Sequence, residues 1–251
     1  MNADPVGPAG LLAAWEAGQT ARHGSERALL LHRAARPDSS GDALLSMPVG
    51  AREADLLALR RALFGDRMQV LVECAACGEA MEFELDAGGL TQRPGQPAGP
   101  LRVEADGWVV EFRLPTVADI EAAARSALDA ADARRRLVAR CTVSAERAGE
   151  QVSADRLADL PEAVQRRLAE AAEQADPAAE VTLNVACPEC GEATPAELDI
   201  ASYLWTELDA WARDLLLDVH LLASAYGWSE PEILALSPLR RRYYLELCAD
   251  A

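Results

Sequence analysis

The sequence predicts a mainly α-helical protein that carries one small β element. Alanine and leucine dominate the 251 residues, and half of the chain is hydrophobic; both of these residues favour helices. Most segments place apolar residues at helical spacing. The exception is a fifteen-residue phrase that occurs twice, VECAACGEAMEFELD from Val72 and VACPECGEATPAELD from Val185. Runs typical of short strands flank both copies, so we expect an α+β fold with its β part at the repeated phrase.

Residues 1–66 are expected to form an N-terminal helical region. Leu11 and Trp15 share one face of a first helix. The run SERALLLHRAA begins with Ser25, which is a candidate N-cap for a second helix. A further run, VGAREADLLALRRALFGD, keeps apolar residues at helical spacing. It ends at Gly65, a residue type that commonly terminates helices.

Residues 67–90 and 181–199 are expected to form the two halves of a split zinc ribbon. Each copy of the phrase has the order strand, Cys-x-x-Cys-Gly, strand, and the glycine permits the backbone conformation of a tight turn. Such a turn directs two thiolates to one point, whereas a tetrahedral zinc takes four ligands. One copy is therefore half a site, and two copies hold one structural Zn²⁺. The four expected ligands are Cys74, Cys77, Cys187 and Cys190.

Other uses of the cysteines stay open at this point. A Cys-x-x-Cys pair can be a redox centre, but such a pair prefers a helix N-terminus after a strand, and here strands lie on both sides. Incidental reduced thiols are the other alternative. No signal peptide is visible, so we expect a cytoplasmic protein whose cysteines are thiols or metal ligands rather than disulfides. Cys141 and Cys248 stand alone in helical sequence, and we expect both to be small buried hydrophobes.

Residues 91–180 are expected to form an α/β insert whose base is clamped by the ribbon. A Gly- and Pro-rich stretch, AGGLTQRPGQPAGP, predicts an exposed loop, and LRVEADGWVVEFRLP predicts a hairpin that turns at Asp106-Gly107. We expect a single helix over PTVADIEAAARSALDAADARRRLVARC, with Thr116 as its cap and Asp119 at the third helical position. LPEAVQRRLAEAAEQ predicts another helix.

Residues 200–251 are expected to form a C-terminal helical region. An amphipathic helix over 200–226 carries one long apolar stripe, and Gly227 ends it. Ser229 and Glu232 form a capping box for a short helix, after which PLRRRYYLELC makes a last one.

The C-terminal region is also the densest aromatic stretch of an aromatic-poor chain. Because aromatic side chains are enriched at binding hot spots, we predict that a partner protein binds there. The competing interpretation is that all of these aromatic residues belong to the core. The candidate contact residues are Trp205, Trp211, Trp228, Tyr243 and Tyr244.

The composition disfavours several classes of function. A formal net charge of −17 repels phosphate backbones and anionic membrane surfaces, so we expect neither nucleic acid nor membrane as a partner. No segment approaches the roughly 20 apolar residues of a membrane span. Motifs of hydrolases, metalloproteases and nucleotide-binding enzymes are missing. The histidines, His23, His32 and His220, lie in helical sequence, and we expect no enzyme.

A zinc-ribbon DNA-binding regulator is the alternative from another class. The segment AYGWSEPEILALSPLRRRYYLELC could form a helix-turn-helix, and Arg240, Arg241 and Arg242 could contact phosphates. Acidic residues surround this single basic cluster, which weighs against the alternative because a regulator needs a coherent basic face.

Several motifs occur together in a way that points to a family. LLAAWEAG and RALLLHRAA lie near the start, VGAREADLLALRRALFGDRMQVLVECAACGE follows, and FRLPTVADI lies in the insert. The second cysteine phrase leads into LDIASYLWTELDAWARDLLLDVHLLASAYGWSEPEILALSPLRRRYYLEL. The chain resembles baseplate proteins, or T-even-type baseplate hub assembly chaperones, of contractile phage tails and phage-tail-like injection systems. The resemblance implies a role in assembly, with baseplate or hub components as partners.

Overall fold

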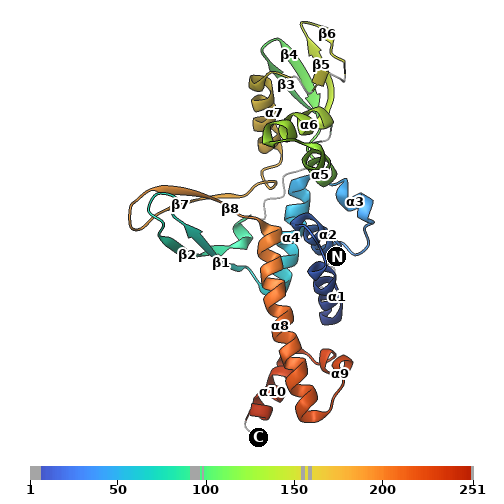
Figure 1. Ribbon diagram of the computed structural model, residues 1–251, viewed down its shortest axis with the longest axis vertical. Coiled ribbons are helices and arrows are strands. Elements are labelled where there is room, and N and C mark those ends of the chain that lie inside the picture. Colours follow the sequence, from blue (N-terminus) through green and yellow to red (C-terminus); the bar gives the residue numbers. More distant parts are fainter. Residues whose placement is uncertain (1–6, 91–96, 98, 154–155, 158–159, 250–251) are drawn as a thin grey trace. The chain divides into compact units, whose positions relative to one another are not determined.

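The computed structural model describes residues 7–90, 97, 99–153, 156–157, 160–249 (Figure 1). The chain forms two compact units, one from Met1–Ala34 with Ala201–Ala251 and the other from Ala35–Ile200. Helices predominate, and the strands form small antiparallel sheets, which confirms the α+β class. Among the helices of these described residues, none is both long and apolar enough to cross a membrane.

The first unit is helical. Its elements are α1 (Pro8–Gln19), α2 (Gly24–Ala35), α8 (Ile200–Tyr226), α9 (Glu230–Leu234) and α10 (Pro238–Ala249). The apolar stripe predicted for α8 is buried at Leu204, Leu208, Leu215 and Leu222. Gly227, at φ 69°, follows the last helical residue, as predicted. The expected capping box of Ser229 and Glu232 is present.

Helix α2 begins at Gly24, so the prediction that Ser25 caps it was wrong. The carboxylate of Glu26 accepts a hydrogen bond from the backbone N–H of Arg22 at 2.7 Å. The carbonyl of His23 accepts from the backbone N–H groups of Glu26 and Arg27 at 3.2 and 3.4 Å, so Ser25 lies inside the first helical turn and not at the N-cap position.

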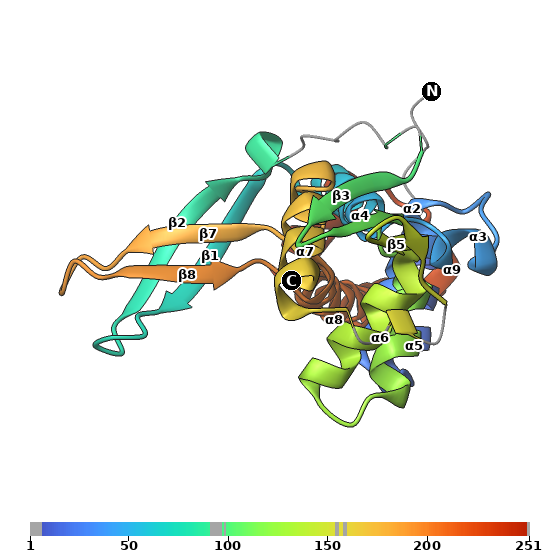
Figure 2. The ribbon, with the colours of Figure 1, turned by 90° about the horizontal axis from the view of Figure 1, so that it is seen from above.

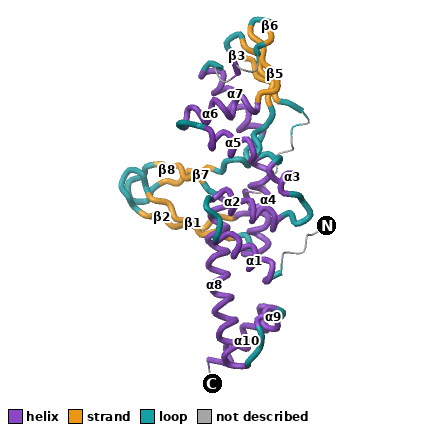
Figure 3. The backbone as a smooth tube through the Cα atoms, turned by 45° about the vertical axis from the view of Figure 1, so that its right-hand side comes forward, coloured by secondary structure: helices purple, strands orange, loops and turns teal. Residues whose placement is uncertain are grey.

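The second unit contains two separate hairpins and a larger sheet, whose strands are orange in Figure 3. The hairpins pair β1 (Arg67–Glu73) with β2 (Ala80–Asp86), and β7 (Thr182–Ala186) with β8 (Ala193–Glu197). Ahead of them come α3 (Gly41–Leu45) and α4 (Val49–Phe64), and a short 3-10 turn, η1 (Ala87–Leu90), follows β2.

The insert combines a four-stranded antiparallel sheet with three helices. The strands, in the order in which they pair, are β3 (Leu101–Ala105), β4 (Trp108–Phe112), β5 (Thr142–Arg147) and β6 (Glu150–Gln151). The helices are α5 (Val117–Ser126), α6 (Ala130–Cys141) and α7 (Glu162–Ala175). As predicted, β3 turns into β4 at Asp106 and Gly107, whose φ angles are 50° and 76°. Of the predicted exposed loop, Ala87–Leu90 instead form η1 with Ala87 buried, and residues 91–96 and 98 lie outside the described residues.

Two features of the insert differ from the prediction. The expected single helix is broken into α5 and α6, because the side chain of Asp129 accepts from the backbone N–H of Asp132 at 2.8 Å and begins a new helix. The hairpin β5–β6 was not predicted. Ala148 and Gly149 turn it at φ 51° and 86°, and no strong turn motif such as Asn-Gly marks the position.

A long-range contact fixes the start of α4. The buried carboxylate of Asp176, just after α7, accepts a hydrogen bond from the backbone N–H of Gly50 at 2.9 Å. A Cβ atom at residue 50 would lie 1.8 Å from this carboxylate, so only glycine allows the approach. Asp176 thereby caps a helix that lies more than a hundred residues away in the sequence.

Candidate metal centre

The two cysteine phrases occupy the ends of the two small hairpins. Figures 1 and 2 both show β1–β2 lying against β7–β8. The turn of the first hairpin carries Cys74 and Cys77, and that of the second carries Cys187 and Cys190. Segments more than a hundred residues apart thus present their cysteines to one place, as the repeat predicted.

The two turns have the same backbone hydrogen bonds. In the first, the N–H of Cys74 donates to the carbonyl of Glu79 at 2.8 Å, and the N–H of Gly78 donates to the carbonyl of Cys74 at 2.9 Å. In the second, the equivalent bonds join Cys187 with Glu192 and Gly191 with Cys187, both at 2.9 Å. Both glycines have positive φ, 76° and 74°, which explains why glycine follows the second cysteine in each copy.

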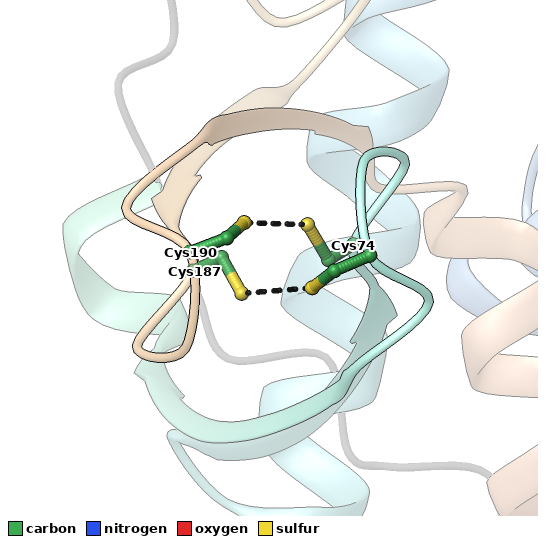
Figure 4. Close-up of side chains that lie close together, drawn as sticks. Cys74, Cys187 and Cys190 are labelled. Atoms are coloured by element: carbon green, nitrogen blue, oxygen red, sulfur yellow. Dashed lines mark hydrogen bonds between the residues drawn. The ribbon is translucent and has the colours of Figure 1, made fainter.

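The four sulfur atoms form one compact group. The Sγ atoms of Cys74 and Cys190 are 3.7 Å apart, those of Cys77 and Cys187 are 3.6 Å apart, and all four lie within 4.8 Å of one another (Figure 4). These separations are far longer than the roughly 2.05 Å of a disulfide bond. Cys74 and Cys187 are buried and the other two are exposed. The group can therefore hold a metal ion that is shielded on one side by protein.

The electrostatics of the group favour a bound cation. Backbone N–H groups of Cys77 and Ala76 lower the pKa of the Cys74 thiol to about 6. The backbone N–H of Glu79 also lowers the pKa of Cys77, but the adjacent sulfur of Cys74 and burial outweigh it and raise that pKa to about 12. The first thiolate thus opposes ionisation of its neighbour. A divalent ion removes this opposition, since metal-bound cysteines are deprotonated.

One residue of the site was missed by the sequence reasoning. The hydroxyl of Thr194, which is buried, lies 3.7 Å from Sγ of Cys74 and can donate a hydrogen bond to it. Thr194 occupies the place in the second phrase that Met81 occupies in the first, and Met81 instead packs beside the cysteines. Several other positions also differ between the two copies, so the sequence carried no distinct signal for Thr194.

The predicted partner-binding aromatic residues lie in several environments. Trp205 is half-buried across Gly18, where an added Cβ would lie 2.2 Å from its ring, and it stacks with the guanidinium of Arg27 at 4.9 Å. Trp211 packs against the buried cluster that contains Leu12 and Leu215. Each of these contacts joins α8 to the N-terminal helices of the same unit.

The other three predicted aromatic residues lie at the end of the chain. Trp228 and Tyr244 are half-buried, 4.9 Å apart between ring centroids, and meet edge to face. Tyr243 is 60% exposed. Their role in binding a partner stays a prediction, and Tyr243 is the most accessible of the five.

The basic cluster of the DNA-binding alternative does not form one face. Arg241 is buried, and its Nε donates to the carboxylate of Asp218 at 3.0 Å. Arg242 pairs with Glu246 at 3.0 Å on the exposed side of α10. Of the two cysteines outside the sulfur group, Cys141 is buried as expected, whereas Cys248 is only half-buried, against the cluster of Val219 and Leu222.

Residues 33–202, about two thirds of the chain, match the family described as T4 bacteriophage base plate protein. The chain belongs to this family. Membership confirms the resemblance seen in the sequence and identifies a phage baseplate component. The matched range contains both cysteine phrases and the insert, and it ends near the start of α8, so α9 and α10 lie outside it. Searches of curated proteins and of solved structures gave no match.

Proposed function

We propose that the protein is a non-enzymatic, zinc-stabilised assembly chaperone or baseplate component of a contractile phage-tail-like injection system. The observation that carries the proposal is the family match, which spans the metal centre and the insert. Baseplate assembly requires contacts with other baseplate or hub proteins rather than a reaction. We place the protein in the cytoplasm, where thiols stay reduced and can ligate a metal.

The geometry of the cysteines supports zinc as the metal. With Zn–S bonds of about 2.3 Å, a tetrahedral ion places its sulfur ligands about 3.8 Å apart, close to the observed 3.6 and 3.7 Å. Four thiolates leave no open position for a catalytic water, so the ion would stabilise the fold and not react.

The ribbon has little else to hold it together. Around the sulfur group, Cys74, Met81 and Cys187 form one small buried cluster with Thr194 beside it, and Met68 and Val70 are buried farther from the turn on β1. Each half is a two-stranded hairpin, and isolated hairpins are marginally stable in water. The metal would therefore join two weak elements and close the base of the insert between them.

A partner surface is supported by apolar side chains exposed on the C-terminal helices. Within the described part of the chain, most of the exposed large apolar residues fall between Leu216 and Leu247. Leu239, Tyr243 and Leu247 are 65%, 60% and 60% exposed, and their spacing of four residues places them on one face of α10. We call these three residues the α10 stripe. Baseplate or hub proteins are its proposed partners.

Alanine substitutions in the α10 stripe should weaken capture of a baseplate or hub protein. We expect Tyr243→Ala combined with Leu247→Ala to reduce capture at least about tenfold, because truncating central interface anchors typically costs more than 1 kcal/mol. The measurement is a pull-down from cells that express the neighbouring baseplate genes, quantified by mass spectrometry. Melting temperature and zinc content should stay unchanged, since both side chains are exposed.

Leu128 supplies the matched control, because it is 92% exposed but lies on the insert, between α5 and α6. Leu128→Ala should capture partners as the wild type does. Normal capture by a variant with all three stripe residues replaced would show that the partner surface lies elsewhere.

A further inference from the structure

The insert contains a cavity of about 630 Å³ between α6 and α7. Its walls are mainly apolar and include Leu137, Val138 and Cys141 of α6 and Ala169 and Ala172 of α7. Burial raises the pKa of the Cys141 thiol to about 11, so this side chain is uncharged at neutral pH. The volume falls in the range of roughly 300–1,000 Å³ that is usual for binding pockets.

The cavity is elongated. Its lining follows α7 from Glu162 at the first residue of the helix to Asp176 directly after the last. At 1.5 Å per residue this distance is about 21 Å, which an extended chain of about six residues spans. A long, mostly apolar channel of this length suits an extended peptide segment better than a compact small molecule.

One end of the cavity is acidic and lacks a matching cation. Asp176 lines it with only 6% of its surface exposed. Its Oδ2 accepts the hydrogen bond from Gly50, and no described residue donates to its Oδ1. Glu173 and Glu180 line the same end, are exposed, and form no ion pair within the described chain. Three arginines also line the cavity: Arg113 is bound to Asp119, Arg166 pairs with Glu162 at the other end of α7, and Arg134 lies on α6.

The carboxylate of Asp176 receives one hydrogen bond from a described protein group, and it has the capacity to accept more. Buried charges in proteins are normally paired, and a carboxylate can accept several hydrogen bonds. Burial raises the pKa of Asp176 above its ordinary value, and the single bond from Gly50 opposes that shift only in part. A guanidinium or ammonium group placed at this end would complete the pairing.

We propose that this cavity binds an extended apolar segment of a partner protein, about six residues long, whose one basic side chain pairs with Asp176. The proposal rests on the assembly role proposed above, because it names a second contact by which a baseplate partner would be held. It is separate from the α10 stripe, which lies in the other unit.

The test uses full-length, zinc-loaded protein and an array of hexapeptides. Five positions are drawn from Ala, Val, Leu and Phe, and the remaining terminal position carries Arg, its neutral isostere citrulline, or Glu. We expect wild-type protein to bind a subset of Arg peptides at least about tenfold more tightly than their citrulline counterparts, since a desolvated charge pair couples this strongly. Glu peptides should bind least.

Two variants locate the binding. Asp176→Asn keeps an acceptor for the N–H of Gly50 but removes the charge, so it should abolish the preference for Arg over citrulline. Ala169→Trp, at an exposed helical position that lines the cavity, should fill the channel and abolish binding of all peptides. Glu82→Gln, on the exposed face of β2, is the control and should bind as the wild type does.

The proposal is overturned if no peptide binds, or if Arg and citrulline peptides bind equally. It is also overturned if the Asp176→Asn variant still prefers Arg peptides. The pull-down of baseplate proteins described above distinguishes failure of the cavity proposal from failure of the assembly role. If Ala169→Trp captures baseplate proteins as the wild type does, the assembly role stands and the cavity is not the contact.

Discussion

A Cys187→Ser variant will purify with much less than one zinc per chain and will lose the structure of the ribbon. Serine cannot replace a thiolate in a zinc site built from four cysteines, and the free energy of metal binding in such sites, roughly 10–16 kcal/mol in small zinc domains, is also folding free energy. Here the buried cluster beside the sulfurs is small, with Cys74, Met81 and Cys187 as its members, so little other packing near the site compensates. Elemental analysis measures the zinc content. Hydrogen exchange of the backbone amides measures the loss of ribbon structure in β1, β2, β7 and β8.

The insert should respond less than the ribbon to this substitution. Its own core includes Val110, Phe112, Val164 and Leu168, and this cluster is separate from the one that contains the cysteines. We therefore expect its amides to stay protected while those of the hairpins exchange. Cys248→Ser is the control, since Cys248 lies outside the sulfur group, and it should retain one zinc per chain. The zinc assignment would be refuted if wild-type protein, purified without chelator, contained no metal and still melted normally.

An Asp119→Asn variant should lose about 2–3 kcal/mol of stability at neutral pH. Asp119 is 2% exposed and accepts hydrogen bonds from Arg113 at 2.9 Å, from Arg140 at 3.3 Å and from the backbone N–H of Thr116 at 3.1 Å. Removing one partner of a buried ion pair costs about 3–5 kcal/mol. We expect somewhat less because the guanidinium groups are close to half-exposed and screened by solvent.

The effect of Asp119 should depend on pH in a defined direction. Burial alone would raise its pKa, but hydrogen bonds from Arg113 and Thr116 outweigh burial and hold the pKa well below its ordinary value of 3.8. A depressed pKa stabilises the fold at every pH above 3.8, and this contribution is lost as the pH falls below that value.

Denaturation of wild type and Asp119→Asn at pH 7 and at pH 2–3 measures this dependence. The difference in unfolding free energy should shrink at the lower pH. Glu104→Gln is the control, because Glu104 pairs with Arg102 on β3 where both side chains are more than half exposed, and it should change stability far less. A difference that stays constant from pH 7 to pH 2 would show that charge is not the cause.

Local sequence signals predicted the parts of the fold that depend on neighbouring residues. The repeated Cys-x-x-Cys-Gly phrase identified the four sulfurs because its turn has the same hydrogen bonds in both copies. Three other features were predicted because they also depend on neighbouring residues. They are the capping box of Thr116 with Asp119, the turn at Asp106-Gly107 and the end of α8 at Gly227.

Contacts between distant segments could not be predicted in this way. Asp176 caps α4 through Gly50, and nothing near either residue in the sequence marks the pairing. Trp205 lies across Gly18, so a residue that the composition suggested for a partner surface also packs inside its own unit. The break before Asp129 was missed because Ala, Arg and Leu continue the helical pattern on both sides of it.

The most direct test of a role in baseplate assembly is to delete the gene in a cell that produces the particles. The particles from the deletion strain are then examined by electron microscopy. If this protein is a zinc-stabilised component of baseplate assembly, the deletion strain will lack complete contractile tails. The wild-type gene will restore them, Cys248→Ser will restore them, and Cys187→Ser will not. Normal tails with complete baseplates in the deletion strain would contradict the account.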